Sequence, residues 1–163
     1  MRRVALPAGI AGGLFLHAMP GRKQSMAAFL ADCQAERIGR LVCLTGVQEL
    51  REGSPQYAYA IEVGDVTPEM FPISDFGVPE DRAVFLAKAR EIAAALRAGG
   101  RVLLHCAYGR GRTGTMAVAV LLALGLSLAE ADKLVRRAGS GPETAAQEEL
   151  VNWTAGEFSR AGA

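Results

Sequence analysis

The sequence predicts an α/β fold, with a central, mostly parallel (mixed) sheet of about four or five strands flanked by helices on both faces. Three observations indicate this class. Segments with strand character alternate with amphipathic helical segments along the chain. No internal repeat or low-complexity linker interrupts the alternation. The chain has 163 residues, 50% of them hydrophobic and 21% charged, which suits one domain over residues 1–163 with a core of its own.

The strands are predicted where apolar runs are short and bounded by turn residues. The first two enclose a Gly-rich turn, the third and the last are the most apolar, and the fourth is short. They are Arg3–Leu6, Leu14–Ala18, Arg40–Leu44, Glu69–Ile73 and Arg101–Cys106.

Helices are predicted where apolar residues recur at helical spacing behind a capping signal. Ser25, Ser54, Ser127 and Thr144 are the capping residues, and capping boxes are predicted for Ser127 with Glu130 and for Thr144 with Gln147. The expected helices are Ser25–Arg37, a turn at Val47–Arg51, one beginning at Ser54, Glu80–Ala98, Arg112–Leu124, Ser127–Ala138, and a last one from Thr144 that carries Phe158. Ligands in such folds bind at the carboxyl ends of the strands.

Composition excludes several classes of protein. A net charge of +1 gives no reason to expect a nucleic-acid partner. The three cysteines, Cys33, Cys43 and Cys106, form no CxxC pair, so neither a disulfide framework nor a metal site is predicted. Free thiols suit a reducing cytoplasm.

The chain also shows no membrane signal. Arg2 and Arg3 precede an apolar stretch that imitates a signal peptide, but Pro7 and several glycines interrupt it. The apolar run Met116–Leu126 is too short to span a bilayer. We therefore expect a cytoplasmic protein without a membrane span, and a monomer is the default because nothing in the sequence indicates an oligomer.

One stretch, HCAYGRGRTG over 105–114, carries the chemistry. It leaves a predicted strand at Cys106 and enters a predicted helix at Arg112. Successive backbone N–H groups in such a loop can surround an oxyanion, and the helix N-terminus adds positive potential. Gly109 and Gly111 allow the backbone to approach a ligand closely. Residues Ala107, Tyr108, Gly109, Arg110, Gly111 and Arg112 are therefore predicted to bind a phosphate.

Cys106 and Arg112 have separate tasks in this prediction. The field that binds the anion also favours a thiolate, so Cys106 is expected to be an activated nucleophile. Arg112 can hold two phosphate oxygens with its planar guanidinium. A thiolate beneath a phosphoryl group predicts a covalent phosphocysteine.

The pattern HC-x5-R-T resembles the signature of the cysteine-dependent protein tyrosine phosphatases, and most closely that of the small atypical dual-specificity phosphatases. The resemblance implies that Asp75, in FPISDFGVP, is the general acid. It implies that Thr113 donates a hydrogen bond to the thiolate, and that His105 orients the loop. It also implies a metal-free reaction that needs no cofactor.

The resemblance suggests weaker roles for three further residues. Gln147 matches a glutamine that positions water in some relatives, although a capping role alone would also explain it. Arg22, in MPGRK, resembles part of a substrate-side loop. Arg110 stands where relatives often have a small or apolar residue, and it either contacts the substrate or is a solvated charge.

Several alternatives stay open at this point. Asp81 is the rival to Asp75, although its place in a helix first turn is itself stabilising. Cys43 is a candidate disulfide partner of Cys106 under oxidation. His17 is expected to be structural.

The predicted activity is hydrolysis of phosphotyrosine on a phosphorylated protein or a small phosphomonoester, with phosphoserine and phosphothreonine as further candidate substrates. The alternative substrate is a phosphoinositide or inositol phosphate. A third alternative is a phosphate-binding module without turnover.

Overall fold

The computed structural model describes residues 1–161 and shows one five-stranded sheet. Its strands are β1 (Arg2–Val4), β2 (Gly13–Ala18), β3 (Arg40–Cys43), β4 (Glu69–Met70) and β5 (Arg101–Cys106). The spatial order is β1-β2-β5-β3-β4, and only the β1–β2 pair is antiparallel. The predicted mixed, mostly parallel sheet is confirmed.

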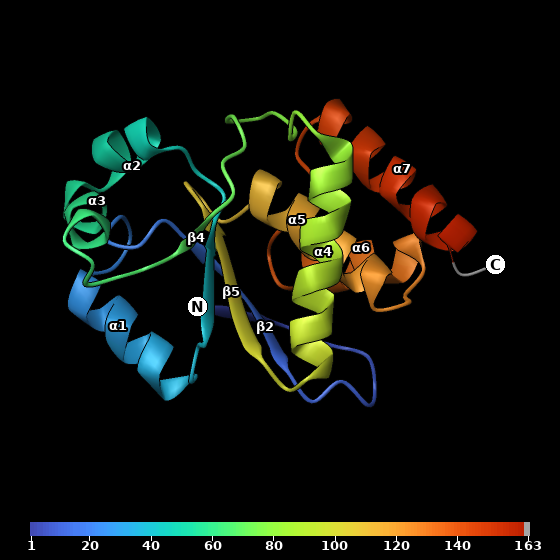
Figure 1. Cartoon of the computed structure of the whole chain (residues 1–163), viewed down its shortest axis with the longest axis horizontal. Coiled ribbons are helices and arrows are strands. Elements are labelled where there is room, and N and C mark those ends of the chain that lie inside the picture. Colours follow the sequence, from blue (N-terminus) through green and yellow to red (C-terminus); the bar gives the residue numbers. More distant parts are fainter. Residues whose placement is uncertain (162–163) are drawn as a thin grey trace.

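Seven helices over the described residues cover the two faces of the sheet (Figure 1). One face carries the N-terminal helices α1 (Met26–Ala35), α2 (Val47–Gly53) and α3 (Pro55–Glu62). The other carries α4 (Arg82–Arg97), α5 (Gly111–Ala123), α6 (Leu128–Arg137) and α7 (Ala145–Ala161).

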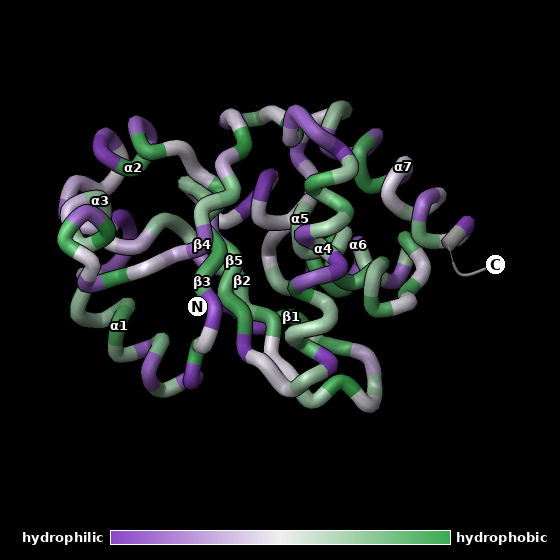
Figure 2. The backbone as a smooth tube through the Cα atoms, in the orientation of Figure 1, coloured by the Kyte–Doolittle hydropathy of each residue, from purple (hydrophilic) through white to green (hydrophobic). Residues whose placement is uncertain are grey.

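The core follows from this layering. The central strands are hydrophobic over most of their length (Figure 2), because both of their faces are covered. Helix α5 is buried along nearly its whole length, since it packs against β5 and against α4, α6 and α7. A helix surrounded in this way holds its N-terminus rigidly at the end of β5.

Three predicted boundaries were wrong by a few residues. β1 ends at Val4 rather than at residue 6, and β4 stops at Met70. The chain nevertheless continues beside β3, because the N–H groups of Phe71 and Ile73 donate to carbonyl groups of β3 and of the residue after it. Helix α4 begins at Arg82 because Asp81 caps it, accepting hydrogen bonds from the N–H groups of residues 83 and 84.

Strand register places the residues of the HCAYGRGRTG motif at one edge of the sheet. Ala18 of β2 pairs with Cys106 of β5, and Cys43 of β3 pairs with His105. These parallel strands therefore end side by side, where α5 begins. Within residues 1–161, no helix is long and apolar enough to cross a bilayer.

Candidate functional site

The loop from Cys106 to Arg112, called here the Cys106 loop, connects β5 to α5. Its tight path depends on Gly109, whose φ of +68° belongs to the left-handed region. A Cβ atom at Gly109 would lie 2.3 Å from the carbonyl oxygen of His17. One at Gly111 would lie 2.9 Å from the side chains of Glu143 and Gln147. Glycine is therefore required at position 109, where the contact is with backbone, whereas a Cβ at position 111 would displace the ends of two flexible side chains.

Carbonyl groups of the Cys106 loop are engaged by neighbours outside it. The N–H of Met19 donates to the Ala107 carbonyl at 3.2 Å. The Ser140 hydroxyl lies 3.1 Å from the Gly109 carbonyl oxygen and 3.0 Å from that of Arg110. These contacts turn carbonyl oxygens away from the cup of the loop. The Gly111 N–H is taken by the Glu143 carboxylate at 2.9 Å, which leaves the other loop amides for a ligand.

Cys106 forms the floor of a small depression, with only 3% of its surface exposed. The N-terminus of α5 lies beside it, so the helix dipole favours negative charge there. Thr113 is buried, and its hydroxyl has no hydrogen-bond partner within the described residues. The hydrogen bond to the Cys106 sulfur that the resemblance implies is therefore not formed in this structure. A buried hydroxyl without a partner is costly, which marks this spot as a place where a further acceptor belongs.

Arg112 is almost completely buried behind the depression. Its guanidinium donates two hydrogen bonds of 2.7 Å to the carboxylate of Glu49 and one of 2.8 Å to Asp75. It also donates to the Ile73 carbonyl at 3.0 Å. Burial acts to lower the pKa of Arg112, but the neighbouring anions outweigh it and the pKa is raised. The guanidinium is therefore fixed in position and charged.

Asp75 reaches the depression, whereas Asp81 does not. The Asp75 carboxylate is half exposed, accepts from Arg112 and also accepts from the Phe76 N–H at 3.1 Å. Asp81 is occupied as the cap of α4. The structure thus separates the two aspartates that the sequence left as rivals.

His105 is buried on the opposite side of the strand from Cys106. Its Nε2 lies 2.9 Å from the hydroxyl oxygen of the buried Tyr57. Burial lowers the pKa of His105 to about 3, so the ring is neutral at neutral pH. It supports the loop from below and does not face the depression.

Gln147 ties the Asp75 segment to the Cys106 loop. Its amide donates to the Gly77 carbonyl at 3.1 Å and accepts from the Glu143 N–H at 2.9 Å. Glu143 in turn accepts from the Gly111 N–H at 2.9 Å. Thr144 does cap α7 through the Gln147 N–H, but the reciprocal half of the expected capping box is absent. The Gln147 side chain also lines the depression, where its two polar atoms make the hydrogen bonds to Gly77 and Glu143.

The remaining predicted residues lie at the rim. Tyr108 is half exposed, and the guanidinium of Arg22 lies 4.1 Å from its ring centre and 2.6 Å from its hydroxyl. Arg22 therefore reaches the site only through Tyr108. Arg110 is exposed and lines both the depression and a neighbouring hollow.

A family model described as "Polymorphic toxin system, DSP-PTPase phosphatase" matches residues 17–126. This range includes β2 to α5 and the whole Cys106 loop. The chain belongs to this phosphatase family. It is a small, cysteine-dependent phosphatase of the dual-specificity type.

Solved structures agree with this membership. The Tk-PTP active form is 31% identical over 88% of the phosphatase and 90% of that chain, with a TM-score of 0.66. Kinase-associated phosphatase, with its catalytic-site cysteine replaced by serine, is 21% identical over 99% of the phosphatase and 95% of that chain, with a TM-score of 0.77. PTPMT1 in complex with PI(5)P is 22% identical over 92% of the phosphatase and 94% of that chain, with a TM-score of 0.69. The matches to kinase-associated phosphatase and to PTPMT1 support the fold. No curated protein matches the sequence.

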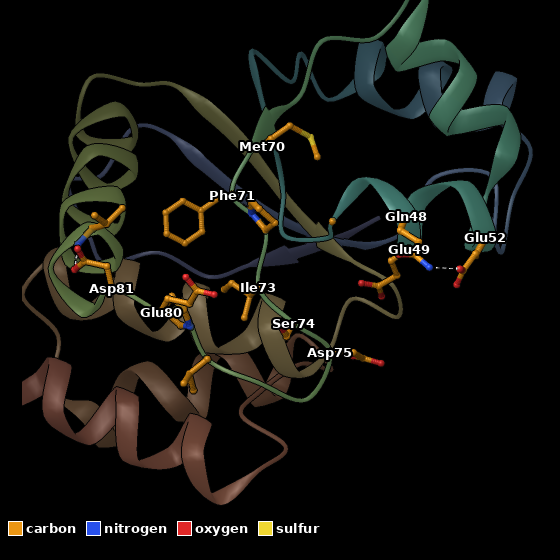
Figure 3. A pocket seen from close by; sticks show the side chains of 15 residues that line it. Gln48, Glu49, Glu52, Met70, Phe71, Ile73, Ser74, Asp75, Glu80 and Asp81 are labelled. Atoms are coloured by element: carbon orange, nitrogen blue, oxygen red, sulfur yellow. Dashed lines mark hydrogen bonds between the residues drawn. The ribbon is translucent and has the colours of Figure 1, made fainter.

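A larger groove of about 810 Å³ adjoins the depression of the phosphatase and shares Asp75 with it. Glu49 and Glu52 of α2 lie on one side and Glu80 and Asp81 on the other, with an apolar floor between them (Figure 3). The residues that line it include no lysine, arginine or histidine. This face beside the site is therefore acidic.

Cys43 does not face Cys106 in the phosphatase. Cys43 pairs in register with His105, so its side chain points to the same face as His105 and away from Cys106. The two thiols belong to different apolar clusters on opposite faces of the sheet. A disulfide between them would require the end of the sheet to rearrange.

Sequence reasoning missed three side chains that contact this site: Arg2, Glu49 and Glu143. Each lies in a segment whose spacing gives no chemical signal, and each meets the site through tertiary packing. For Glu143, the one signal in the sequence was its place four residues before Gln147.

Proposed function

We propose that the phosphatase hydrolyses phosphotyrosine on proteins through a phosphocysteine at Cys106. The observation that carries the proposal is the arrangement around this thiol. A nearly buried sulfur lies at a helix N-terminus, inside an amide-lined loop whose arginine is held in place by Glu49. Such a site stabilises both the thiolate and the charge of a transferring phosphoryl group.

In the first step, the Cys106 thiolate attacks phosphorus and an S–P bond forms. The bond from phosphorus to the tyrosyl oxygen breaks, and that oxygen takes a proton from the Asp75 carboxyl group. Arg112 and the loop amides hold the equatorial oxygens. The products are phosphocysteine, the free tyrosine hydroxyl and an Asp75 carboxylate.

Arg112 couples phosphate binding to the release of Asp75. In the unliganded site, Nη2 of Arg112 donates to Asp75 at 2.8 Å. A dianionic phosphate competes for this donor, because it offers more charge than a carboxylate. Substrate binding therefore frees the Asp75 side chain to turn towards the leaving oxygen.

In the second step, water attacks phosphorus and gives its proton to the Asp75 carboxylate. The S–P bond breaks, inorganic phosphate leaves, and the sulfur departs as a thiolate. The unpartnered Thr113 hydroxyl supplies a hydrogen bond to that thiolate. Gln147, which lines the depression, orients the water.

Two exposed aromatic rings at the mouth favour an aryl phosphate. Phe76, which is 66% exposed, and Tyr108, which is 50% exposed, line the same depression. Phe76 has a φ of +56°, a conformation that is unusual for a bulky residue and is retained beside Asp75. Ring faces at the entrance stabilise a phenyl group, which phosphoserine and phosphothreonine lack.

A phosphoinositide is the second candidate substrate, because PTPMT1 was crystallised with PI(5)P and shares the fold. The acidic groove beside Asp75 argues for the protein substrate. An inositol phosphate carries several negative charges, and these would meet Glu52, Glu80 and Asp81. A phosphopeptide can instead present basic residues to that groove.

The decisive experiment measures phosphate release from matched phosphotyrosine, phosphoserine and phosphothreonine peptides and from PI(5)P. We expect kcat/KM to be highest for phosphotyrosine, and higher with basic than with acidic flanking residues. Faster turnover of PI(5)P would establish the second candidate. No turnover of p-nitrophenyl phosphate would indicate a binding module, and Cys106→Ser is the matched inactive control.

The three cysteines are free, which suits the reducing cytoplasm expected from the sequence.

A substrate-trapping variant, Cys106→Ser with Asp75→Ala, would identify the physiological protein substrate by its retention on the phosphatase. Removing the acid together with the nucleophile leaves the Arg112–Glu49 pair intact for binding.

A further inference from the structure

Arg2, on the edge strand β1, joins two loops at the back of the site. One nitrogen of its guanidinium donates to the carbonyl of Gly109 in the Cys106 loop. The other donates to the carbonyl of Gly139, in the turn that follows α6. Ser140, in the same turn, also donates to the Cys106 loop, so two side chains join these loops.

The sheet register places Arg2 at this point. Arg2 pairs with Leu16 of β2, and Val4 pairs with Leu14. Because side chains alternate along a strand, Arg2 and Val4 face the same side of the sheet. Val4 is buried in the core that also contains Cys106 and α5, so the Arg2 side chain extends towards the start of α5.

The carbonyl that Arg2 contacts is the one whose direction matters most for the loop. Gly109 adopts its left-handed conformation at the turn of the Cys106 loop. A peptide unit whose carbonyl oxygen is held outside the loop has its N–H on the opposite side, towards the cup. Ser140 donates to the same oxygen at 3.1 Å, so a cation and a hydroxyl together fix this peptide.

The charge of Arg2 also reaches the nucleophile. Burial lowers the pKa of Arg2, and a negatively charged Cys106 acts to raise it. A cation at this position attracts a negative charge at Cys106. This attraction adds to that of the Arg112 guanidinium, at the end of the Cys106 loop.

We propose that Arg2 is a positioning residue for the phosphatase reaction: by holding the Gly109 carbonyl outside the loop, it keeps the amides of the Cys106 loop directed at the phosphate and the thiolate. This inference rests on the proposed function. Arg2 does not line the depression, so it acts through the loop and not on the substrate.

The test uses Arg2→Met, which keeps the unbranched, mostly apolar part of the side chain and removes the guanidinium donors. We expect tungstate affinity, measured by calorimetry, to fall about tenfold, because a charge-assisted hydrogen bond to the loop is lost. The pH midpoint of iodoacetamide alkylation of Cys106 should move upward. For p-nitrophenyl phosphate, kcat should fall more than KM rises.

Arg3→Met is the matched control, because Arg3 is the adjacent, exposed arginine and its guanidinium lies over the Phe15 ring, away from the loop. It should leave tungstate affinity and the alkylation profile unchanged. Arg2→Lys should be intermediate, since one ammonium group cannot span both carbonyls as the guanidinium fork does.

Ser140→Ala covers the case in which Arg2→Met does not fold. It removes the second donor to the Gly109 carbonyl and should weaken tungstate binding in the same direction. Arg2→Met with wild-type tungstate affinity and alkylation profile would overturn the proposal, as would equal effects of Arg2→Met and Arg3→Met. Tungstate binding and alkylation require no turnover, so these readouts separate a failure of this inference from a failure of the proposed function.

Discussion

The guanidinium of Arg112 and the carboxylate of Glu49 are joined by two hydrogen bonds of 2.7 Å each. This paired geometry fixes the plane of the guanidinium, so that its other donors are directed before a ligand arrives. Helix α2 therefore contributes to the site, although it lies on the opposite face of the sheet from α5. A preorganised donor costs less to bring to the transition state than a mobile one.

Glu49→Gln should reduce kcat/KM for p-nitrophenyl phosphate by about tenfold, because the amide NH2 group cannot accept one of the two bonds from Arg112 and the acceptor of the other bond is no longer charged. Asp75 would then be the remaining carboxylate that pairs with Arg112. Steady-state kinetics measure the loss. Glu62→Gln, an exposed carboxylate of α3, is the control and should retain wild-type rates.

Much of this architecture was predictable because it depends on local patterns. Hydrophobic period and caps such as Ser25 and Ser127 located the helices, and glycine spacing located the Cys106 loop. The family resemblance supplied Asp75, and the structure places it at Arg112.

What the sequence did not reveal depends on contacts between distant segments. Glu49 is an ordinary helix residue until the fold brings it to Arg112, and Arg2 is an ordinary edge-strand residue until it meets Gly109. The expected Cys43–Cys106 proximity failed for a related reason. Neighbouring strands place residues near one another, but the alternation of side chains decides which face each one occupies.

Asp75→Asn should affect substrates according to their leaving groups. An alkyl or phenyl phosphate needs a proton on the departing oxygen, so kcat should fall by about 100-fold. An activated aryl phosphate leaves without this proton and should lose much less. The measurement is kcat for a series of aryl phosphates of increasing leaving-group pKa, in which the variant should show the steeper dependence.

An Asp81→Asn variant is the control for this series. Because Asp81 caps α4, its loss should lower the melting temperature without changing the leaving-group dependence. An equal loss on activated and unactivated substrates for Asp75→Asn would show that Asp75 is not the acid.

Thr113→Val should separate the two chemical steps. The hydroxyl has no partner in the unliganded site, and it is proposed to stabilise the departing thiolate. Replacing it by a methyl group should slow breakdown of the phosphocysteine by about tenfold and leave its formation nearly unchanged. Rapid-quench kinetics should then show a burst of p-nitrophenol followed by a slow steady state.

Thr113→Ser keeps the hydroxyl and should restore the wild-type pattern. Thermal unfolding adds an independent check. Thr113→Val should not be destabilising, because it removes a buried polar group that lacks a hydrogen bond. Absence of a burst in Thr113→Val, with the rate of formation reduced instead, would assign the hydroxyl to the first step.

His105 should make the phosphatase less stable as the pH falls. Its pKa is lowered from 6.5 to about 3, mainly by burial, so the folded protein keeps the ring neutral while the unfolded chain protonates it near 6.5. Between these values the unfolded state binds more protons, and the free energy of unfolding therefore decreases by up to about 1.4 kcal/mol for each unit of falling pH. The tested variant is His105→Gln, whose amide can still meet the Tyr57 hydroxyl.

Urea denaturation at about pH 5 and about pH 6 isolates the histidines, because most carboxylates titrate at lower pH. The chain has two histidines, and His17, whose pKa is also lowered by burial, is present in both proteins and cancels in the comparison. His105→Gln should then show a pH dependence shallower by close to one proton. An unchanged slope would mean that His105 is protonated in the folded protein, and the neutral Tyr57–His105 hydrogen bond would have to be reassigned.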